Sequence, residues 1–180
     1  MSRRGQWMVA GGLGAAIAIA VTLALVFAPP AVSVGIGAPD FEAVNIATGD
    51  TVALSDYRGE VLLVNLWATW CEPCEAEMPE IERLYQELKP LGLRVLAVSV
   101  DEQSSDVVRK WIAERGFTFD VLHDRKGTVE NLYRAVGLPE SFVIDRQGRI
   151  VKRVTGWIVH WDDRVQKALF RRLLERKTDS

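Results

Sequence analysis

The sequence is poor in metal-ligating side chains, because its 180 residues include only two cysteines and two histidines. A structural zinc site needs four such ligands, usually at short spacing. His123 and His160 lie far from the cysteine pair and from each other, so the composition argues against such a site. A secreted domain held together by disulfides would carry more cysteines. The two cysteines therefore need another explanation.

Long hydrophobic runs are also scarce, with one exception at residues 7–28, which carry no charge. Roughly 22 helical residues span the hydrocarbon core of a bilayer. Arg3 and Arg4 precede the run, so we expect the start of the chain to stay in the cytoplasm and the remainder to cross. A cleaved signal peptide is the alternative, although Pro29 and Pro30 should hinder cleavage.

Charge of one sign does not dominate, since 22 Lys and Arg residues stand against 24 Asp and Glu residues. The sequence shows no basic stripe, which gives little support to nucleic-acid binding. The basic cluster at 171–177 is most simply the solvated face of a terminal helix. We expect residues 1–34 to form a cytoplasmic start, a transmembrane anchor and a tether. Residues 35–180 have the size of one domain with its own core.

Cys71 and Cys74 lie in the stretch Trp70-Cys71-Glu72-Pro73-Cys74. The pair follows an apolar run at 61–67, typical of a buried strand, and precedes a helical pattern at 74–88. A sulfur at the positive end of a helix is stabilised as a thiolate, and a second sulfur one turn deeper can attack a mixed disulfide formed by the first. The spacing therefore predicts thiol–disulfide exchange. A purely structural disulfide is the other interpretation, but a bridge across two residues stabilises a fold only weakly.

Strand and helix patterns alternate along the soluble part, which indicates a layered α/β domain. The expected strands, of which the first two form a hairpin, are 41–46, 51–54, 61–67, 93–100, 119–122, 142–144 and 150–155. The expected helices are 74–88, 105–115, 128–135 and 162–175. Ser105 is the expected N-cap of the second helix, and Gly116 its stop. Val165, Leu169 and Leu173 form the expected buried stripe of the last helix.

Two separated blocks, at 65–79 and 137–145, carry a resemblance to the thioredoxin superfamily. The first reads Asn-Leu-Trp-Ala-Thr-Trp-Cys-Glu-Pro-Cys and then Glu-Met-Pro, and the second Gly-Leu-Pro-Glu-Ser-Phe-Val-Ile-Asp. The chain is most similar to the membrane-anchored TlpA/ResA-like thiol–disulfide oxidoreductases of bacteria. The resemblance covers residues 36–174. It implies a thioredoxin-like fold with an N-terminal β-hairpin, an inserted helix at 105–115, and a cis-proline at Pro139 that faces the cysteines.

The resemblance also implies an activity and a location. Proteins of this kind reduce disulfides outside the cytoplasmic membrane, notably during cytochrome c maturation and copper-site assembly of respiratory oxidases. The expected partners are disulfide-containing extracytoplasmic proteins, such as apocytochrome c or copper-site assembly proteins, and a membrane thiol electron donor. We expect neither a cofactor nor a metal.

Asn65 departs from ordinary thioredoxins, which keep a buried aspartate at that strand position. In the TlpA/ResA-like pattern a glutamate after the active site is thought to manage the proton instead, and it corresponds to Glu77. Glu77 follows Cys74 by three residues, so both project from one face of the helix. The alternative is a solvent-facing helix glutamate.

We expect Cys71 to be the nucleophile and Cys74 to resolve the mixed disulfide. The expected substrate-binding residues flank the two sulfurs and are Trp70, Glu72, Pro73, Leu138, Pro139 and Glu140. Negative neighbours disfavour a thiolate and leave a disulfide comparatively reducing. Four glutamates are expected near the pair, at 72, 75, 77 and 140, and the motif has no arginine or lysine, which favours a reductase over an oxidase.

Three alternatives remain at this point. A thioredoxin-fold peroxidase would need an arginine near its reactive cysteine; Thr69 is present, but the motif contains no arginine. A copper metallochaperone could use His123 or His160 as a third ligand beside the cysteines. A catalytically idle, membrane-tethered interaction domain is the third.

Overall fold

The structure is a computed structural model that describes residues 32–157 and 160–176. The predicted anchor at 7–28 lies outside the described residues and stays a prediction. Within the described ranges, no helix is both long and apolar enough to cross a bilayer. From Val32 onward the chain forms one compact unit.

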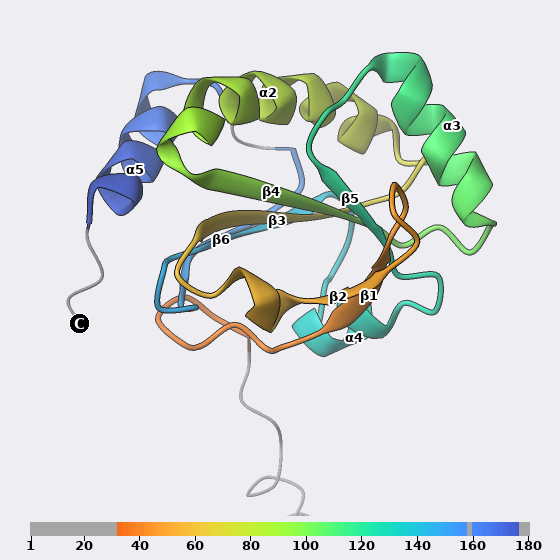
Figure 1. Cartoon of the computed structure of the whole chain (residues 1–180), viewed down its shortest axis with the longest axis horizontal. Helices are drawn as coiled ribbons and strands as arrows, with labels where there is room; N and C mark the ends of the chain where they lie inside the picture. Colours follow the sequence, from red (N-terminus) through yellow and green to blue (C-terminus); the bar gives the residue numbers. More distant parts are fainter. Residues whose placement is uncertain (1–31, 158–159, 177–180) are drawn as a thin grey trace, which may run out of the picture. The chain divides into compact units, whose positions relative to one another are not determined.

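A single seven-stranded mixed sheet forms the middle of this unit (Figure 1). Its strands in spatial order are β2 (Thr51–Ala53), β1 (Glu42–Asn45), β5 (Asp120–His123), β4 (Leu93–Ser99), β3 (Val61–Trp67), β6 (Glu140–Ile144) and β7 (Ile150–Thr155). The central pairs β3–β4 and β4–β5 are parallel, whereas the pairs towards both edges are antiparallel. The predicted thioredoxin-like α/β fold with an N-terminal hairpin is confirmed by this arrangement.

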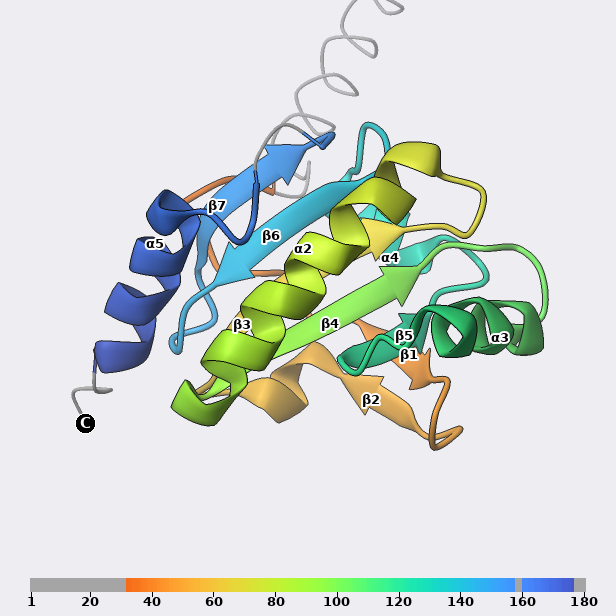
Figure 2. The same cartoon turned by 90° about the horizontal axis from the view of Figure 1, so that it is seen from above.

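Helices cover both faces of the sheet. They are α2 (Glu72–Leu88), α3 (Ser105–Arg115), α4 (Thr128–Tyr133) and α5 (Arg164–Glu175), with short 3-10 turns at η1 (Leu54–Tyr57) and η2 (Lys89–Leu91). Figure 1 shows α2, α3 and α5 on one face and α4 on the other, and Figure 2 shows α2 lying across β3 and β4. The inserted helix expected at 105–115 is present as α3.

The strand β3 positions the cysteines. All seven of its residues are buried, because side chains pointing to either face meet helices. Leu63 and Trp67 pack into the core under α2, while Leu62 and Leu66 pack into the core on the α4 side. The Cys71 loop leaves directly from the end of this strand, so a fully buried central strand carries the site.

Helix boundaries follow local chemistry that the sequence patterns located only in part. The helix α2 begins at Glu72, two residues earlier than expected, with Pro73 in its first turn, where a missing N–H costs nothing. The predicted N-cap Ser105 is wrong: Ser104 takes the cap position, and the Ser105 hydroxyl lies 2.8 Å from His123 Nδ1. Gly116 ends α3 as expected, with a φ of 69°.

The last two helices are shorter than the patterns indicated. The helix α4 ends at Tyr133, before Gly137 is reached. The helix α5 begins at Arg164, capped by the Asp163 side chain. Its predicted stripe is partly wrong, because Val165 is 71% exposed, whereas Phe170, Leu173 and Leu174 are buried.

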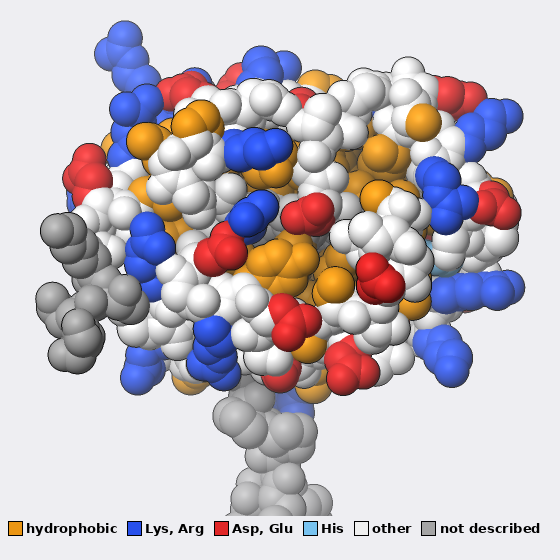
Figure 3. All heavy atoms as spheres, viewed as in Figure 1, with side chains coloured by type: hydrophobic (Ala, Val, Ile, Leu, Met, Phe, Trp, Pro, Cys, Tyr) orange, Lys and Arg blue, Asp and Glu red, His pale blue; other side chains and the backbone are white. Residues whose placement is uncertain are grey.

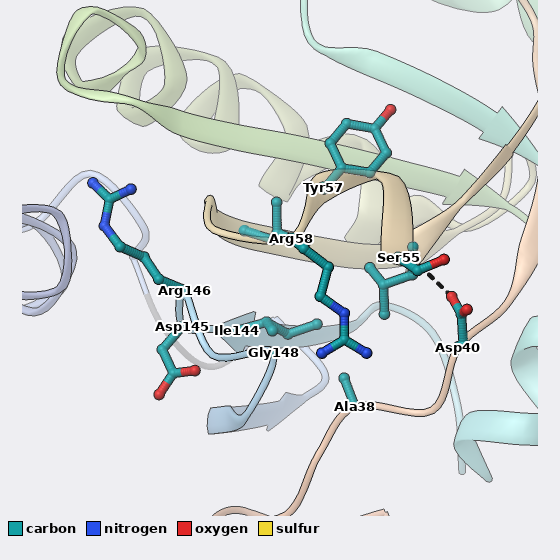
Figure 4. A pocket seen from close by; sticks show the side chains of 11 residues that line it. Ala38, Asp40, Ser55, Tyr57, Arg58, Ile144, Asp145, Arg146 and Gly148 are labelled. Carbon is teal, nitrogen blue, oxygen red and sulfur yellow. Dashed lines mark hydrogen bonds between the residues drawn. The ribbon is translucent and has the colours of Figure 1, made fainter. Parts of the chain in front are cut away.

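Two surface features complete the description. Figure 3 shows charged side chains of both signs interspersed over one face, without a broad region of one sign. A cavity of about 30 Å³ lies beside Leu62 near the start of β3, with Tyr57 and Arg58 in its wall; next to it Asp40 accepts the Ser55 backbone N–H at 2.9 Å (Figure 4). This cavity is only large enough for a water-sized molecule and lies at the end of β3 opposite to Cys71, so we assign it no function.

Candidate active site around the Cys71–Cys74 pair

Cys71 and Cys74 form a disulfide at the first turn of α2, with 5.2 Å between their Cα atoms. Cys71 is the N-cap residue, and its Sγ accepts the Cys74 backbone N–H at 3.2 Å. Both residues are buried, Cys71 at 6% exposure and Cys74 at 1%. The sulfur of Cys71 therefore lies at the positive helix end, where a thiolate is stabilised, and Cys71 is the more accessible residue of the two.

The residues around the cysteine pair differ in how far their side chains are exposed to a substrate. The Trp70 side chain is 67% exposed, and Glu72 and Pro73 are exposed as well. The Leu138–Pro139 peptide bond is cis, as the resemblance implied. Leu66 of β3 pairs with Glu140 of β6, so Pro139 lies one residue beyond this pair, at the end of β3 from which the Cys71 loop leaves.

Glu140 does not fill the place expected for it. Its side chain is fully buried and on β6 shares the α4 face of the sheet with Phe142, whereas the cysteines lie on the α2 face. Its carboxylate accepts Arg153 Nε at 2.6 Å and the Thr155 hydroxyl at 2.8 Å. The expectation that this side chain adds negative charge to the cysteine pair or meets a substrate is therefore wrong.

The negative charge of Glu75 is partly neutralised by an ion pair that the motif alone does not reveal. Arg115, at the end of α3, places Nη2 2.6 Å from Glu75 Oε1. An arginine from a different element thus reaches the active-site helix, although the motif itself has none. Glu72 and Glu77 remain as the acidic neighbours expected from the sequence.

Glu77 is buried inside the protein, not on its surface. Its side chain accepts Asn65 Nδ2 on Oε2 at 3.0 Å and Trp161 Nε1 on Oε1 at 2.5 Å, at 1% exposure of the residue. Burial raises the pKa of Glu77 to about 7, a shift that nearby Glu80 reinforces and the two hydrogen bonds oppose. The alternative of a solvent-facing glutamate is wrong, and a carboxyl that titrates near neutral pH lies one helical turn from Cys74.

Asn65 links Glu77 to the neighbouring strand. It lies in β3 opposite Ser141 of β6, and its Nδ2 also donates to Ser141 Oγ at 2.9 Å. Its Oδ1 is buried and has no hydrogen-bond partner among the residues that the structure describes. At the position where ordinary thioredoxins have an aspartate, this chain therefore has a neutral amide. That amide donates a hydrogen bond to the Glu77 carboxyl.

The segment before α5 contacts α2 through hydrogen bonds from His160 and Trp161 to the carboxylates of Glu77 and Glu80. Trp161 is fully buried, and besides its indole bond to Glu77 it donates its backbone N–H to Glu80 Oε2 at 3.1 Å. His160 Nδ1 lies 2.9 Å from Glu80 Oε1, and this contact raises the pKa of His160. Sequence reasoning missed Trp161, because 84 residues separate it from Glu77 and no local motif marks it.

Asp101 fixes the loop that precedes the cysteines. Its buried carboxylate accepts the Thr69 backbone N–H at 2.9 Å, the Thr69 hydroxyl at 2.6 Å and the Ser99 hydroxyl at 2.7 Å. His123 Nε2 lies 2.8 Å from the Asp101 carbonyl oxygen. Both histidines thus contact groups other than the sulfurs. In the part of the chain that the structure describes, no group of three or more His, Cys, Asp and Glu side chains is placed to hold a metal.

Known proteins resemble this chain in fold and in sequence. Residues 34–153 match the AhpC/TSA family. The thiol-disulfide oxidoreductase ResA of Geobacillus kaustophilus is 42% identical over 133 residues, which are 73% of this chain and 75% of that protein. The structure of a putative thiol:disulfide interchange protein DsbE from Chlorobium tepidum has a TM-score of 0.67 at 30% identity and covers 80% of this chain and 96% of its own. A putative protein disulfide isomerase from Bacteroides thetaiotaomicron has a TM-score of 0.72 at 26% identity, covering 81% and 92%.

A thioredoxin-like sheet with a Cys-x-x-Cys disulfide at the start of its central helix defines a thiol–disulfide oxidoreductase, an enzyme that acts on disulfide-containing proteins. This chain belongs to the AhpC/TSA family and, within it, to the ResA-like thiol-disulfide oxidoreductases. The resemblance and the enzyme class predicted from the sequence are both confirmed.

Proposed function

We propose that this enzyme reduces disulfides of extracytoplasmic proteins, with Cys71 as its nucleophile. The Cys71 thiolate attacks one sulfur of a substrate disulfide, forms a mixed disulfide and releases the other substrate sulfur as a thiolate. Cys74, as a thiolate, then attacks Cys71 Sγ and releases the second substrate sulfur. Two electrons pass from the enzyme to the substrate, and the Cys71–Cys74 disulfide is left behind.

Glu77 supplies the proton acceptor in this scheme. Cys74 must lose its proton before it attacks, and a buried thiol ionises reluctantly. A carboxyl one turn away whose pKa is about 7 can take that proton near neutral pH and return it later. This buried carboxyl, one helical turn after Cys74, is the observation that carries the proposal.

The reducing direction is supported by charge. Glu72 is exposed beside the pair and Glu77 is buried next to it, and both disfavour additional negative charge on the sulfurs. A destabilised dithiolate makes the reduced form a better electron donor. Arg115 reduces this effect at Glu75 without removing it at the other two glutamates.

The proposed setting is the outer side of the bacterial cytoplasmic membrane, with residues 7–28 as a single-pass anchor. A membrane thiol donor would return electrons to the Cys71–Cys74 disulfide after each turnover. Cytochrome c maturation and respiratory copper-site assembly are the processes that the family resemblance favours, and apocytochrome c and copper-site assembly proteins are the corresponding substrates.

Trapping of mixed disulfides tests the proposal. Cys74→Ser should leave Cys71 able to attack but unable to be released, so covalent complexes with substrate proteins should accumulate on non-reducing gels. Cys71→Ser should trap few or none. The assignment of nucleophile and resolver fails if both variants trap equally, and the proposed activity fails if the wild type does not reduce insulin disulfides.

A further inference from the structure

The two oxygens of the Glu77 carboxyl have different partners. Oε1 accepts from Trp161 and Oε2 from Asn65. An indole N–H can only donate a hydrogen bond, so Trp161 can serve an oxygen that carries no proton and cannot accept from one that does. Trp161 is also held in place, since it is fully buried, packs against Phe170 and bonds Glu80 through its backbone.

Asn65 is different, because its amide has a donor end and an acceptor end on one planar group. A half-turn about its terminal bond exchanges Nδ2 and Oδ1 at nearly unchanged shape. Its second partner, the Ser141 hydroxyl, accepts from Nδ2 in this structure and could equally donate to Oδ1. In the described residues Oδ1 is buried without a partner. The half-turn would place it where Nδ2 now lies, facing Glu77 Oε2 and the Ser141 hydroxyl, from which it could accept hydrogen bonds.

We infer that Glu77 takes its proton on Oε2, with Trp161 holding Oε1, and that the Asn65 amide turns over to accept the new O–H while the Ser141 hydroxyl reverses. Asn65 and Trp161 are thus positioning residues for the proton carrier, and the carboxyl keeps hydrogen bonds in both protonation states. The inference deepens the proposed function, in which the proton on Oε2 comes from the Cys74 thiol. No electrons move in this step, and the Cys74 thiolate that remains is the group that attacks Cys71.

Burial is the main cause of the raised pKa of Glu77, and among the charged groups of the described residues Glu80 adds a smaller part. Glu80 of α2 raises the pKa of Glu77, and His160 contacts the far side of Glu80. From β7, Lys152 places Nζ 5.7 Å from the centre of a Trp161 ring. The two cysteines are bridged in this state and do not titrate. The hydrogen bonds of Trp161 and Asn65 lower the pKa of Glu77, and they also decide which oxygen receives the proton.

Infrared spectroscopy of the full-length oxidised protein in detergent micelles tests the first half of the inference. Glu77→Gln identifies the carboxylic C=O band of Glu77, which should appear as the pH falls through about 7. Trp161→Phe should move that band to higher frequency, because the carbonyl oxygen loses its donor. The same variant should raise the midpoint by about one pH unit, a tenfold gain in proton affinity, since a donor to the ionised form is lost. A band that does not move would place the proton on Oε1 and overturn the inference.

The second half needs its own signal. With asparagine labelled by ¹³C in the side-chain amide, the C=O band of Asn65, identified by Asn65→Leu, should move to lower frequency as Glu77 is protonated. An Asn65 band that stays fixed through the titration would show that the amide does not turn over. Ser141→Ala removes the hydroxyl that has to reverse with the amide, so the Asn65 band should shift less in this variant. A shift of wild-type size in Ser141→Ala would contradict the part assigned to Ser141.

A second variant distinguishes the loss of the indole N–H from a change in core packing caused by Trp161→Phe. Trp161 can be replaced by benzothienylalanine, which keeps the shape of the indole and has sulfur in place of the N–H. It should reproduce the frequency shift of Trp161→Phe, and a wild-type band in this variant would again contradict the inference. The measurements use no substrate, so a failed insulin assay with the expected bands would reject the proposed function while leaving the location of the proton established.

Discussion

Arg115 and Glu75 join the end of α3 to the first turn of the active-site helix, with 2.6 Å between Nη2 and Oε1. The guanidinium also lies 3.8 Å from the centre of a Trp111 ring, and Trp111 packs against Trp67 at the end of β3. One arginine therefore connects the inserted helix, the central strand and the residue that follows Cys74. It also partly offsets the acidic character of the motif.

Replacing this arginine should make the thiols harder to ionise. In Arg115→Gln the Glu75 carboxylate loses its partner, and we expect the pKa of the Cys71 thiol to rise by a few tenths of a unit. The effect is small because both side chains are partly exposed and screened by solvent. A pH titration of thiolate absorbance at low and high salt measures it. Arg83→Gln, which breaks an exposed ion pair with Asp162, is the control, and equal shifts in the two variants would contradict the idea.

Much of the fold could be predicted because its central elements have unambiguous patterns. The strand at 61–67 is apolar on both faces and bounded by turn residues, and its observed limits agree with the prediction. Exact helix boundaries were less predictable. Ser105 and Ser104 are equally good caps by residue type; Ser104 takes the cap position without a side-chain hydrogen bond, and the Ser105 hydroxyl lies 2.8 Å from His123 Nδ1.

The site shows the same division. The motif itself located the disulfide, and spacing along one helix placed Glu77 near Cys74. Sequence could not show that Glu140 faces the other side of the sheet, since every residue of β6 is buried and the strand has no polar alternation to read. The hydrogen bond from Trp161 to Glu77 could not be predicted either, because it forms only when the loop before α5 packs against α2, 84 residues away in the sequence.

Asp101 offers a test of how the cysteine loop is held. Its carboxylate accepts three hydrogen bonds from Thr69 and Ser99, and in Asp101→Asn all three lose their charged acceptor, while the Thr69 hydroxyl has to reverse to accept the amide N–H. We expect the free energy of unfolding to fall by about 1–3 kcal/mol, because hydrogen bonds to a charged group are worth about twice as much as bonds to a neutral one. The rate of insulin reduction should fall too, because Thr69 positions the Cys71 loop.

Urea unfolding and the insulin assay measure both effects of Asp101→Asn. The matched control is Asp106→Asn on α3, whose carboxylate is highly exposed and should contribute little. Identical unfolding midpoints for wild type and Asp101→Asn would show that the loop is held by something other than this carboxylate.

The topology of the chain is open to a direct experiment. Arg3 and Arg4 precede the apolar run at 7–28, so the anchor should be retained and the domain from residue 35 onward should face outwards. Protease added to intact spheroplasts should digest the domain, while a cytoplasmic marker protein stays whole. Full protection of the domain would reverse the predicted orientation, and a mature protein starting near Pro29 would mean that the run is a cleaved signal peptide.

Glu77 should make stability depend on pH in a defined window. Burial raises its pKa from 4.5 to about 7, so the folded state keeps a proton that the unfolded state releases between these values. The folded wild type, with its disulfide intact, should therefore lose up to about 3 kcal/mol of stability as the pH rises from 4.5 to 7. Glu77→Gln carries no such proton, so its stability relative to wild type should grow across that window. Parallel urea-unfolding curves for the two proteins would contradict this, and exposed Glu72→Gln should run parallel to wild type.

The same substitution should change the chemistry of the thiols. With a pKa of about 7, Glu77 is largely ionised by the pH at which an ordinary thiol titrates near 8.5, so it opposes a second negative charge in its poorly solvated surroundings. Glu77→Gln should therefore lower the thiol pKa and make the disulfide less reducing. The reductase rate of the wild type should rise as the pH passes through 7, because only the ionised carboxyl can accept the Cys74 proton, and the variant should lack this rise.

Thiolate absorbance, the redox midpoint and the pH–rate profile together measure these effects of Glu77→Gln. Glu72→Gln removes an exposed charge from the same helical turn as Cys74. Its effect on the thiol pKa should weaken with added salt, whereas the effect of the buried Glu77 should persist. Superimposable titrations and equal midpoints for wild type and Glu77→Gln would remove Glu77 from the reaction. The Cys74 proton would then have to leave directly to solvent, which would require the nearly fully buried Cys74 to become exposed during turnover.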